Sequence, residues 1–233
     1  MSIQLVVCDL AGTTVKDNKD VHRVLQMALR EYDVHVTIND ANEVMGLPKP
    51  LAIRLLLEKR KERAVKVTSE LIDSIHRLFV TEMIHFYRND DSFGEKEGVS
   101  ETFRRLKENG IKVAVDTGFD REITNAILQR VEWVDKHLID ASVTSDEVTN
   151  GRPHPDLVFK AMQLTNVSDA KSVAKVGDTI SDLIEGNSAG CGIVVGVTSG
   201  AFSKERLEQE KHTHLIEYIP QLLNILPSTQ VLV

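Results

Sequence analysis

The chain is poor in cysteine, poor in aromatic residues and free of long hydrophobic runs. Its two cysteines, Cys8 and Cys191, are too few for a disulfide framework, and neither belongs to a CxxC pair. No apolar segment approaches the roughly 18 residues of a membrane-spanning helix. The N-terminus has no basic region, and Asp9 interrupts the apolar stretch, which argues against a signal peptide. We therefore expect a cytoplasmic protein that does not act at a membrane.

The chain also lacks an excess of positive charge. Its 28 Lys and Arg are outnumbered by 35 Asp and Glu, which gives a net charge of −7, and aromatic residues make up 5%. Nucleic-acid binding depends on basic surfaces and stacking rings, so no nucleic-acid partner is expected; a local basic pocket for a small anion remains open. The 233 residues, 42% hydrophobic and 27% charged, are typical of one globular domain or of one with an insertion.

Hydrophobic periodicity divides the chain into three stretches. Residues 3–9 form a short apolar run that ends in a carboxylate, as in a buried parallel strand. Residues 19–90 show helical periodicity without strand-like alternation. Beyond them helices alternate with strands. We expect helices at 99–109, 121–131, 155–164 and 180–189, and strands at 111–115, 142–144, 172–177 and 193–197.

This alternation predicts βαβ units and hence an α/β fold with a doubly wound, Rossmann-like parallel sheet. The first strand is separated from the others by the helical stretch, so we interpret that stretch as an insertion. The predicted α/β core comprises residues 1–15 and 96–233, and the predicted helical cap comprises residues 16–95.

Polar residues mark four strand ends, which is where open parallel sheets bind ligands. Asp9 ends the first strand, and its carboxylate can attack phosphorus or hold Mg²⁺, although an Asp here can also simply cap the next helix. Thr117 and Gly118 follow the second strand. Their hydroxyl and backbone N–H groups can hold a phosphate, or the Thr can be an ordinary helix cap.

The other two ends supply a cation and two acids. Arg152 lies in a segment with two prolines and can bind phosphoryl oxygens through paired hydrogen bonds, unless the segment is an ordinary surface loop. Asp178 and Asp182 are four residues apart after a strand, so they can face one divalent cation; alternatively they stabilise a helix N-terminus. The sequence thus supplies a nucleophile, a hydroxyl, a cation and an acid pair in chain order.

In this order the four segments resemble the motifs of the haloacid dehalogenase-like superfamily of phosphoryl-transfer enzymes. The resemblance implies that Asp9 forms an aspartyl-phosphate with the help of Thr117 and Arg152, where Arg152 takes a place that is usually a Lys. It also implies that the helical insertion is a cap. The implied Mg²⁺ ligands are Asp9, the carbonyl of Ala11, Asp178 and, through a water, Asp182.

Residue 11 separates this chain from most phosphatases of that superfamily. They have an Asp there that protonates the leaving alkoxide, a contribution of about 10²–10⁴ in rate, whereas this chain has Ala11. The segment Asp-x-Ala-Gly-Thr-Thr is similar to the phosphonoacetaldehyde hydrolase group, which splits a P–C bond. Three more segments are similar to that group: Met45-Gly46-Leu47-Pro48-Lys49, Gly151-Arg152-Pro153-x-Pro155 and Lys175-Val176-Gly177-Asp178-Thr179-x-Ser181-Asp182.

That second resemblance implies a Schiff base on Lys49. A protonated imine between Lys49 and an aldehyde would accept the electrons released by P–C cleavage. Lys49 can otherwise be a solvated lysine at a helix start or a phosphate-binding cation. The chain departs from the group at Ala52, where the group has a His, and at Phe119, where it has a Tyr. The substrate-binding residues we expect are Gly12, Thr13, Met45 and Gly118.

These observations predict a Mg²⁺-dependent hydrolase that acts on a small phosphonate aldehyde. The expected partner is a small phosphonate or phosphate metabolite, and a homodimer is a further expectation. Two alternatives stay open. One is a phosphatase of a small phosphoester, and the other is a protein that binds a phosphometabolite without catalysis.

Overall fold

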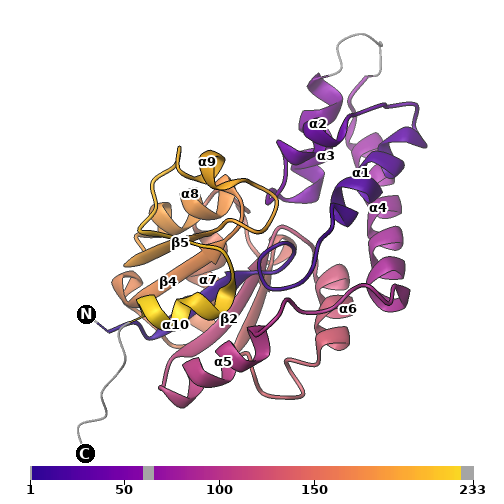
Figure 1. Cartoon of the computed structure of the whole chain (residues 1–233). Helices are drawn as coiled ribbons and strands as arrows, with labels where there is room; N and C mark the ends of the chain where they lie inside the picture. The colour runs from indigo at the N-terminus through magenta and orange to yellow at the C-terminus, as the bar shows by residue number, and fades with distance from the viewer. Residues whose placement is uncertain (1, 60–65, 227–233) are drawn as a thin grey trace, which may run out of the picture.

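A six-stranded parallel sheet forms the centre of the molecule (Figure 1). The computed structural model describes residues 2–59 and 66–226. The strand order is β3-β2-β1-β4-β5-β6, so the first strand of the chain lies in the middle. The strands are β1 (Leu5–Asp9), β2 (Lys112–Thr117), β3 (Ala141–Thr144), β4 (Val173–Gly177), β5 (Ile193–Val197) and β6 (His214–Ile216).

Helices cover both faces of the sheet, because the strands bury apolar side chains on both sides. Val6 and Cys8 of β1 belong to one hydrophobic cluster, and Leu5 and Val7 belong to the other. The first cluster includes residues of α5 (Val99–Glu108), α6 (Arg121–Val131) and α10 (Leu222–Ile225). The second includes residues of α7 (Asp156–Leu164), α8 (Ile180–Ala189) and α9 (Lys204–Leu207). The predicted doubly wound α/β fold is therefore confirmed.

Four helices lie between β1 and α5 in sequence and form a block beside the sheet (Figure 1). They are α1 (Asp20–Arg30), α2 (Ile38–Asn42), α3 (Lys49–Lys59) and α4 (Ser69–Asn89). Among the described residues of this block no strand occurs, as the periodicity predicted. Helix α4 packs against α1 and α3 within the block and against α6 of the core. We call this block the cap; its domain boundaries stay a prediction.

Two details of the core differ from the sequence prediction. Strand β2 extends to Thr117, so Asp116 and Thr117 belong to the strand and not to the following turn. The edge strand β6 was not predicted. It has three residues, and two of them are partly exposed, so it carries no apolar run that would mark it. None of the described helices has the length and hydropathy to cross a membrane.

Candidate active site

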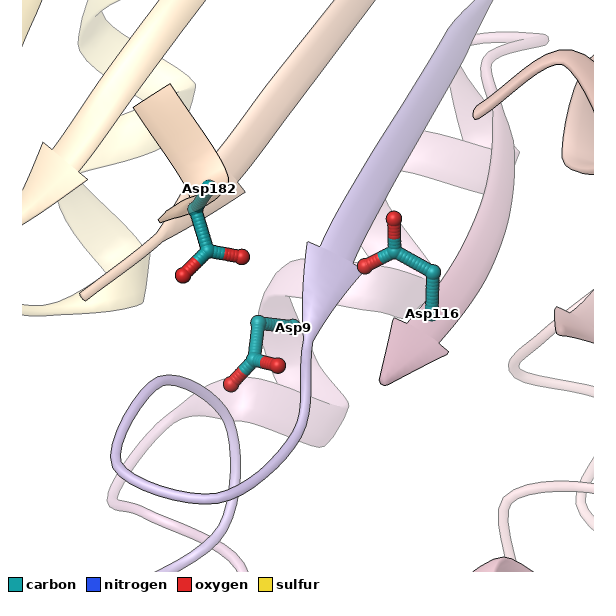
Figure 2. A group of neighbouring side chains, drawn as sticks. All are labelled: Asp9, Asp116 and Asp182. Atoms are coloured by element: carbon teal, nitrogen blue, oxygen red, sulfur yellow. The ribbon is translucent and has the colours of Figure 1, made fainter. Parts of the chain in front are cut away.

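The parallel register brings the polar strand ends together at the carboxyl end of the sheet. Asp9 of β1 lies opposite Asp116 of β2, and Asp178 directly follows β4, the other neighbour of β1. In Figure 2 the carboxylates of Asp9, Asp116 and Asp182 face one common space. They offer oxygen atoms within 4.8 Å of one another, and all three residues are buried.

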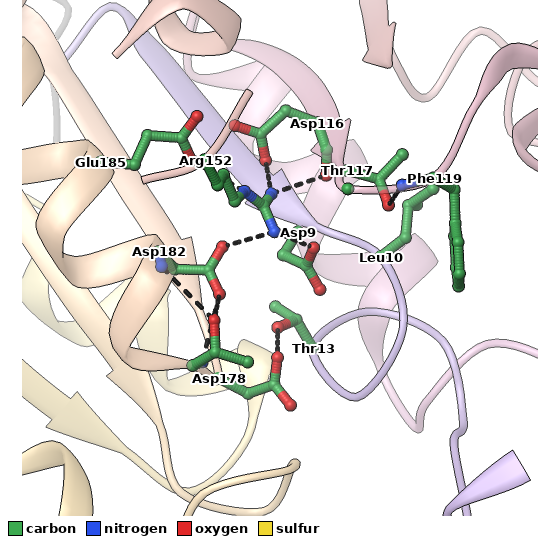
Figure 3. Close-up of polar contacts among 12 residues, drawn as sticks. Asp9, Leu10, Thr13, Asp116, Thr117, Phe119, Arg152, Asp178, Asp182 and Glu185 are labelled. Atoms are coloured by element: carbon green, nitrogen blue, oxygen red, sulfur yellow. Dashed lines mark hydrogen bonds and ion pairs between the residues drawn. The ribbon is translucent and has the colours of Figure 1, made fainter. Parts of the chain in front are cut away.

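The guanidinium of Arg152 occupies the centre of this group (Figure 3). Its Nη1 donates to Oδ1 of Asp9 over 2.6 Å, and its Nη2 donates to Oδ1 of Asp116 over 2.5 Å. Nη1 also lies 3.0 Å from Oδ1 of Asp182, and Nε donates to Oε2 of Glu185 over 2.9 Å. Arg152 is 1% exposed, so the predicted surface-loop alternative is wrong: the side chain is a buried link between four acids.

A second buried cation, Lys175 of β4, completes the ion network. Its Nζ lies 2.5 Å from Oδ1 of Asp116, 3.0 Å from Oε2 of Glu185 and 3.2 Å from Oδ1 of Asp182. Burial alone would raise the pKa of Asp116, but the two cations outweigh it and hold that pKa below its usual value. Three acid oxygens, Oδ2 of Asp116, Oδ1 of Asp182 and Oε1 of Glu185, have no hydrogen-bond partner among the described residues.

Sequence reasoning assigned no role to Lys175, Asp116 or Glu185. The available signal was a lysine inside an otherwise apolar strand, because a lysine in a doubly covered parallel strand must find a buried acid. The sequence does not show which acid that is. Asp116 is 59 residues from Lys175 and meets it only through the order of the strands.

Asp178 lies outside this network but in the same site. Its Oδ1 accepts a hydrogen bond from Thr13 Oγ1 over 2.9 Å, and its Oδ2 accepts one from the backbone N–H of Ala201 over 2.6 Å. Burial, together with the negative charges of Asp9 and Asp182, raises the pKa of Asp178 to about 8. No ion pair of Asp178 occurs within residues 2–59 and 66–226. This carboxylate therefore stands beside other acids, and Lys96 acts on it electrostatically without forming an ion pair.

Asp182 takes the helix-capping role that was considered for it and also faces Arg152. It forms a capping box with Thr179 at the start of α8, in which Thr179 Oγ1 donates to Oδ2 of Asp182 over 2.6 Å. Its Oδ1 meanwhile faces Arg152. The side chain therefore stabilises a helix N-terminus and at the same time adds negative charge to the site.

One small pocket lies between the cap and the carboxyl end of the sheet. Its cavity volume is about 30 Å³. The predicted site residues that line it are Asp9, Ala11, Met45, Lys49, Thr117, Gly118 and Asp178. The other predicted residues, Gly12, Thr13, Arg152 and Asp182, are not in the lining. Thr13 contacts Asp178, Arg152 contacts Asp9, and Asp182 faces Arg152. A Cβ on Gly12 would lie 2.2 Å from Oδ2 of Asp178. Val21, Gly46, Phe119, Thr179, Ala201 and Asp17 complete the wall.

Lys49 enters the pocket from the cap as the first residue of α3. Its side chain is buried, with the residue 4% exposed, so the alternative of a solvated lysine is wrong. Nζ donates to the carbonyl of Leu47 over 3.2 Å and lies 5.0 Å from the centroid of the Phe119 ring. Burial lowers the pKa of Lys49 to about 8, although the nearby Asp9 carboxylate opposes the shift. A substantial fraction of this amine is thus neutral near pH 8.

Asp9 is the carboxylate across the pocket from this amine. It is 5% exposed, and burial raises its pKa to about 6 while Arg152 opposes the shift. Arg152 binds only Oδ1 of Asp9. Oδ2 therefore carries no hydrogen bond from Arg152.

Close backbone contacts hold the cap against the loops at the carboxyl end of the sheet. A Cβ on Gly118 would lie 2.7 Å from the carbonyl oxygens of Gly46 and Leu47, so only glycine permits this approach. Gly46 itself has φ +81°, and a Cβ there would lie 2.4 Å from Thr179 Oγ1. The loop before Lys49 therefore packs against the loops after β2 and β4. This packing fixes the lysine above Asp9.

Comparison with known proteins agrees with this arrangement. The family model of haloacid dehalogenase-like hydrolases matches residues 3–190. Phosphonoacetaldehyde hydrolase from Bacillus cereus (strain G9842) is 30% identical over 96% of this chain and 88% of its own length. A bifunctional phosphonoacetaldehyde hydrolase/aminoethylphosphonate transaminase from Clostridioides difficile (strain 630) is 31% identical over 88% of this chain and 34% of its own length.

Two solved structures share the fold. A phosphonoacetaldehyde hydrolase-like protein from Oleispira antarctica superposes with a TM-score of 0.85 at 21% identity, covering 97% of this chain and 92% of its own. A predicted phosphoglycolate phosphatase from Haemophilus somnus 129PT superposes with a TM-score of 0.77 at 22% identity, covering 96% of this chain and 97% of its own. With the acidic strand ends, the parallel sheet and the match over most of its length, this chain belongs to the haloacid dehalogenase-like hydrolases.

Proposed function

We propose that this hydrolase cleaves the P–C bond of phosphonoacetaldehyde or a closely similar phosphonate aldehyde. The observation that carries the proposal is the shared pocket of Asp9 and Lys49, a carboxylate and a buried amine with its pKa lowered to about 8. An aldehyde carbon and a phosphorus two bonds apart would need these two nucleophiles on opposite walls of one small site. The names of the relatives at about 30% identity support the same substrate class.

In this proposal the two nucleophiles act in sequence. The neutral amine of Lys49 condenses with the aldehyde, and the resulting protonated imine withdraws electrons from the neighbouring carbon. Oδ2 of Asp9 then attacks phosphorus while the P–C electron pair moves into the enamine. Arg152 holds Oδ1 of Asp9 and so orients the attacking oxygen. The departing carbon needs no protonated oxygen, which is consistent with Ala11 in place of an acid.

The acidic side of the site suits a divalent cation. Asp9, Asp178 and the carbonyl of Ala11 are hard oxygen donors of the kind Mg²⁺ prefers, and all three residues line the pocket. The site holds more carboxylates than cations, and Asp178 has no cationic partner among the described residues. When bound, Mg²⁺ would neutralise charge on the phosphoryl oxygens. Asp116 is not included among these ligands, because it does not line the pocket and its Oδ1 is bound by Arg152 and Lys175.

The test is an activity panel with added Mg²⁺ that measures phosphate release from phosphonoacetaldehyde and from small phosphoesters. We expect release from phosphonoacetaldehyde and a borohydride-trapped adduct on Lys49. Lys49→Arg keeps the charge but removes the nucleophilic amine, so it should lower phosphonate hydrolysis by at least about 10³-fold. Lys16→Arg, at an exposed lysine outside the pocket, is the matched control and should keep its activity.

Three results would contradict the proposal in different ways. A fully active Lys49→Arg variant without a trapped adduct would make Lys49 an anion-binding residue. Phosphate release from phosphoesters alone would identify a phosphatase. Binding of phosphometabolites without any release would identify a binding protein.

A further inference from the structure

We propose that Asp17 is the proton-transfer residue for imine formation on Lys49. This inference rests on the proposed function, since it concerns the aldehyde half of that reaction. The positions at which the family resemblance would place a His and a Tyr hold Ala52 and Phe119, neither of which can transfer a proton. Asp17 lines the same pocket as Lys49 and Asp9, and the phosphoryl-transfer steps give it no task.

The Asp17 side chain is held at the start of α1, and one oxygen is left for chemistry. Its Oδ1 accepts hydrogen bonds from the backbone N–H groups of Asp20 over 2.6 Å and of Val21 over 3.2 Å. These bonds orient the carboxyl group and occupy Oδ1. Oδ2 receives neither of them. The side chain is 8% exposed, so water competes little for that oxygen.

The imidazole of His22 lies beside Asp17, with Nδ1 as its nearer nitrogen. The Nε2 of His22 lies 2.8 Å from Oδ1 of Asn42, an acceptor, which places the imidazole proton on Nε2. Nδ1 is then an acceptor that lies 3.9 Å from Oδ2 of Asp17, and it has no hydrogen-bond partner among the described residues. Burial also raises the pKa of Asp17, although its backbone hydrogen bonds and His22 oppose the shift. Asp17 is thus arranged to hold and release a proton.

The other ionisable groups of the pocket are already engaged. Asp9 binds Arg152, and Asp178 accepts from Thr13 and Ala201. The remaining groups that act electrostatically on Asp17 include Asp20 and His22 of α1, Lys49 of α3, the buried hydroxyl of Tyr87 on α4, and Lys96 just before α5. Burial raises the pKa of Tyr87 well above its usual value, and Tyr87 does not line the pocket. Asp17 is therefore the acid best placed to serve Lys49.

Imine formation on Lys49 proceeds through a carbinolamine. The Lys49 amine adds to the aldehyde carbon, and a proton moves from nitrogen to oxygen to give a neutral carbinolamine. The Asp17 carboxylic acid donates its proton to the carbinolamine hydroxyl, the C–O bond breaks, and water leaves. The nitrogen lone pair forms the C=N bond of the protonated imine, and Asp17 remains as a carboxylate. After P–C cleavage the enamine carbon takes up a proton from solvent, which gives the protonated product imine. Hydrolysis of that imine reverses the steps above and returns the proton to Asp17.

The decisive variant is Asp17→Asn, which keeps an Oδ1 acceptor for the α1 backbone but carries no transferable acid proton. With phosphonoacetaldehyde at saturation, we expect the rate of borohydride-trapped adduct formation on Lys49, and kcat, to fall at least about 100-fold. Asp20→Asn makes the same change three residues away, at a side chain outside the pocket that pairs with Arg23. It should change both rates by less than about threefold.

Further readouts separate the possible failures. Asp17→Glu should form the adduct at least about tenfold faster than Asp17→Asn. If the amide variant unfolds, Asp17→Ser keeps a helix-capping oxygen without an acid and should show the same loss. Adduct formation at the unmodified rate in Asp17→Asn would overturn the role of Asp17 alone. Absence of any adduct in the unmodified enzyme would overturn the proposed function, and this inference with it.

Discussion

Burial of the Lys49 amine disfavours folding at neutral pH. In the unfolded chain its amine is solvated and charged up to a pKa near 10.5, whereas in the folded protein burial lowers the pKa to about 8. Below pH 8 folding therefore transfers a charged amine into a site where its contacts are one carbonyl and one aromatic ring. The reactive amine thus lowers the stability of the fold.

We therefore expect Lys49→Met to stabilise the protein. Each pKa unit corresponds to about 1.4 kcal/mol, so the free energy of unfolding at pH 7 should rise by about 1–3 kcal/mol. Between pH 8 and 10.5 the unfolded state binds more protons than the folded state, so the unmodified protein gains stability as the pH rises. The difference in unfolding free energy between Lys49→Met and the unmodified protein should therefore become smaller in this range. Urea unfolding at pH 7 and pH 9.5 measures this. Lys16→Met, at an exposed lysine, should stay within about 0.5 kcal/mol, and a destabilised Lys49→Met would contradict the argument.

At the residue scale the sequence predicted the side chains that follow strands or occupy recognisable segments. Asp9, Lys49 and Asp178 line the pocket, and Arg152 contacts Asp9. Asp17 was missed, because an acid near a helix start is common and only the packing of the cap shows that it lines the pocket.

At the scale of elements, the ion network joins segments that lie far apart in the sequence. Lys175 comes from β4, Asp116 from β2 and Glu185 from α8, with Arg152 from the loop before α7. All four side chains have no exposed surface. Each buried charge depends on its partners, because an isolated ion in this place would be strongly unfavourable.

Removing one cation from this ion network should therefore lower the stability of the folded protein. We expect Lys175→Met to lower the free energy of unfolding by about 3–5 kcal/mol, because Asp116 and Glu185 would then share the single cation Arg152. Equilibrium urea unfolding at pH 7 is the measurement. Lys171→Met, at an exposed lysine just before β4, should change stability by less than about 0.5 kcal/mol. Equal stability of the Lys175 variant would show that the acids are neutral in the folded protein.

The elements themselves were predictable to different extents. The strands with continuous apolar runs were predicted to within two residues at each end, since burial on both faces requires such runs. Strand β6 was not, because His214 and Leu215 are only partly buried and pair at the sheet edge. The pairing of Asp9 with Asp116 could not be predicted, since register is decided by the packing of the whole sheet.

At the scale of the whole molecule, cap and core enclose the site almost completely. A cavity of about 30 Å³ has room for about one or two water molecules and not for a phosphonate aldehyde. Substrate entry therefore requires the cap to move away from the sheet edge. Closure would then exclude water from the imine and from the aspartyl-phosphate.

A reversible cross-link between cap and core tests this requirement. A Cβ built on Gly151 lies 3.5 Å from Cβ of Pro48, a separation that suits a disulfide. We expect the double variant Pro48→Cys/Gly151→Cys to lose at least about 90% of its activity on oxidation and to regain it on reduction. The two single variants are the controls and should not respond to oxidant, because Cys8 and Cys191 are buried. Full activity of the oxidised double variant would show that substrate enters without cap movement.

The central place of β1 also has a consequence for the order in which the chain folds during synthesis. Leu5 pairs with Lys112 on one side and with Val173 on the other, so the first strand to leave the ribosome waits longest for its neighbours. The cap helices are made before either neighbour exists. Until β4 emerges, β1 keeps an unpaired edge, the kind of surface that invites aggregation. The nascent chain is therefore most vulnerable while β1 and Asp9 are already made and the sheet is still open.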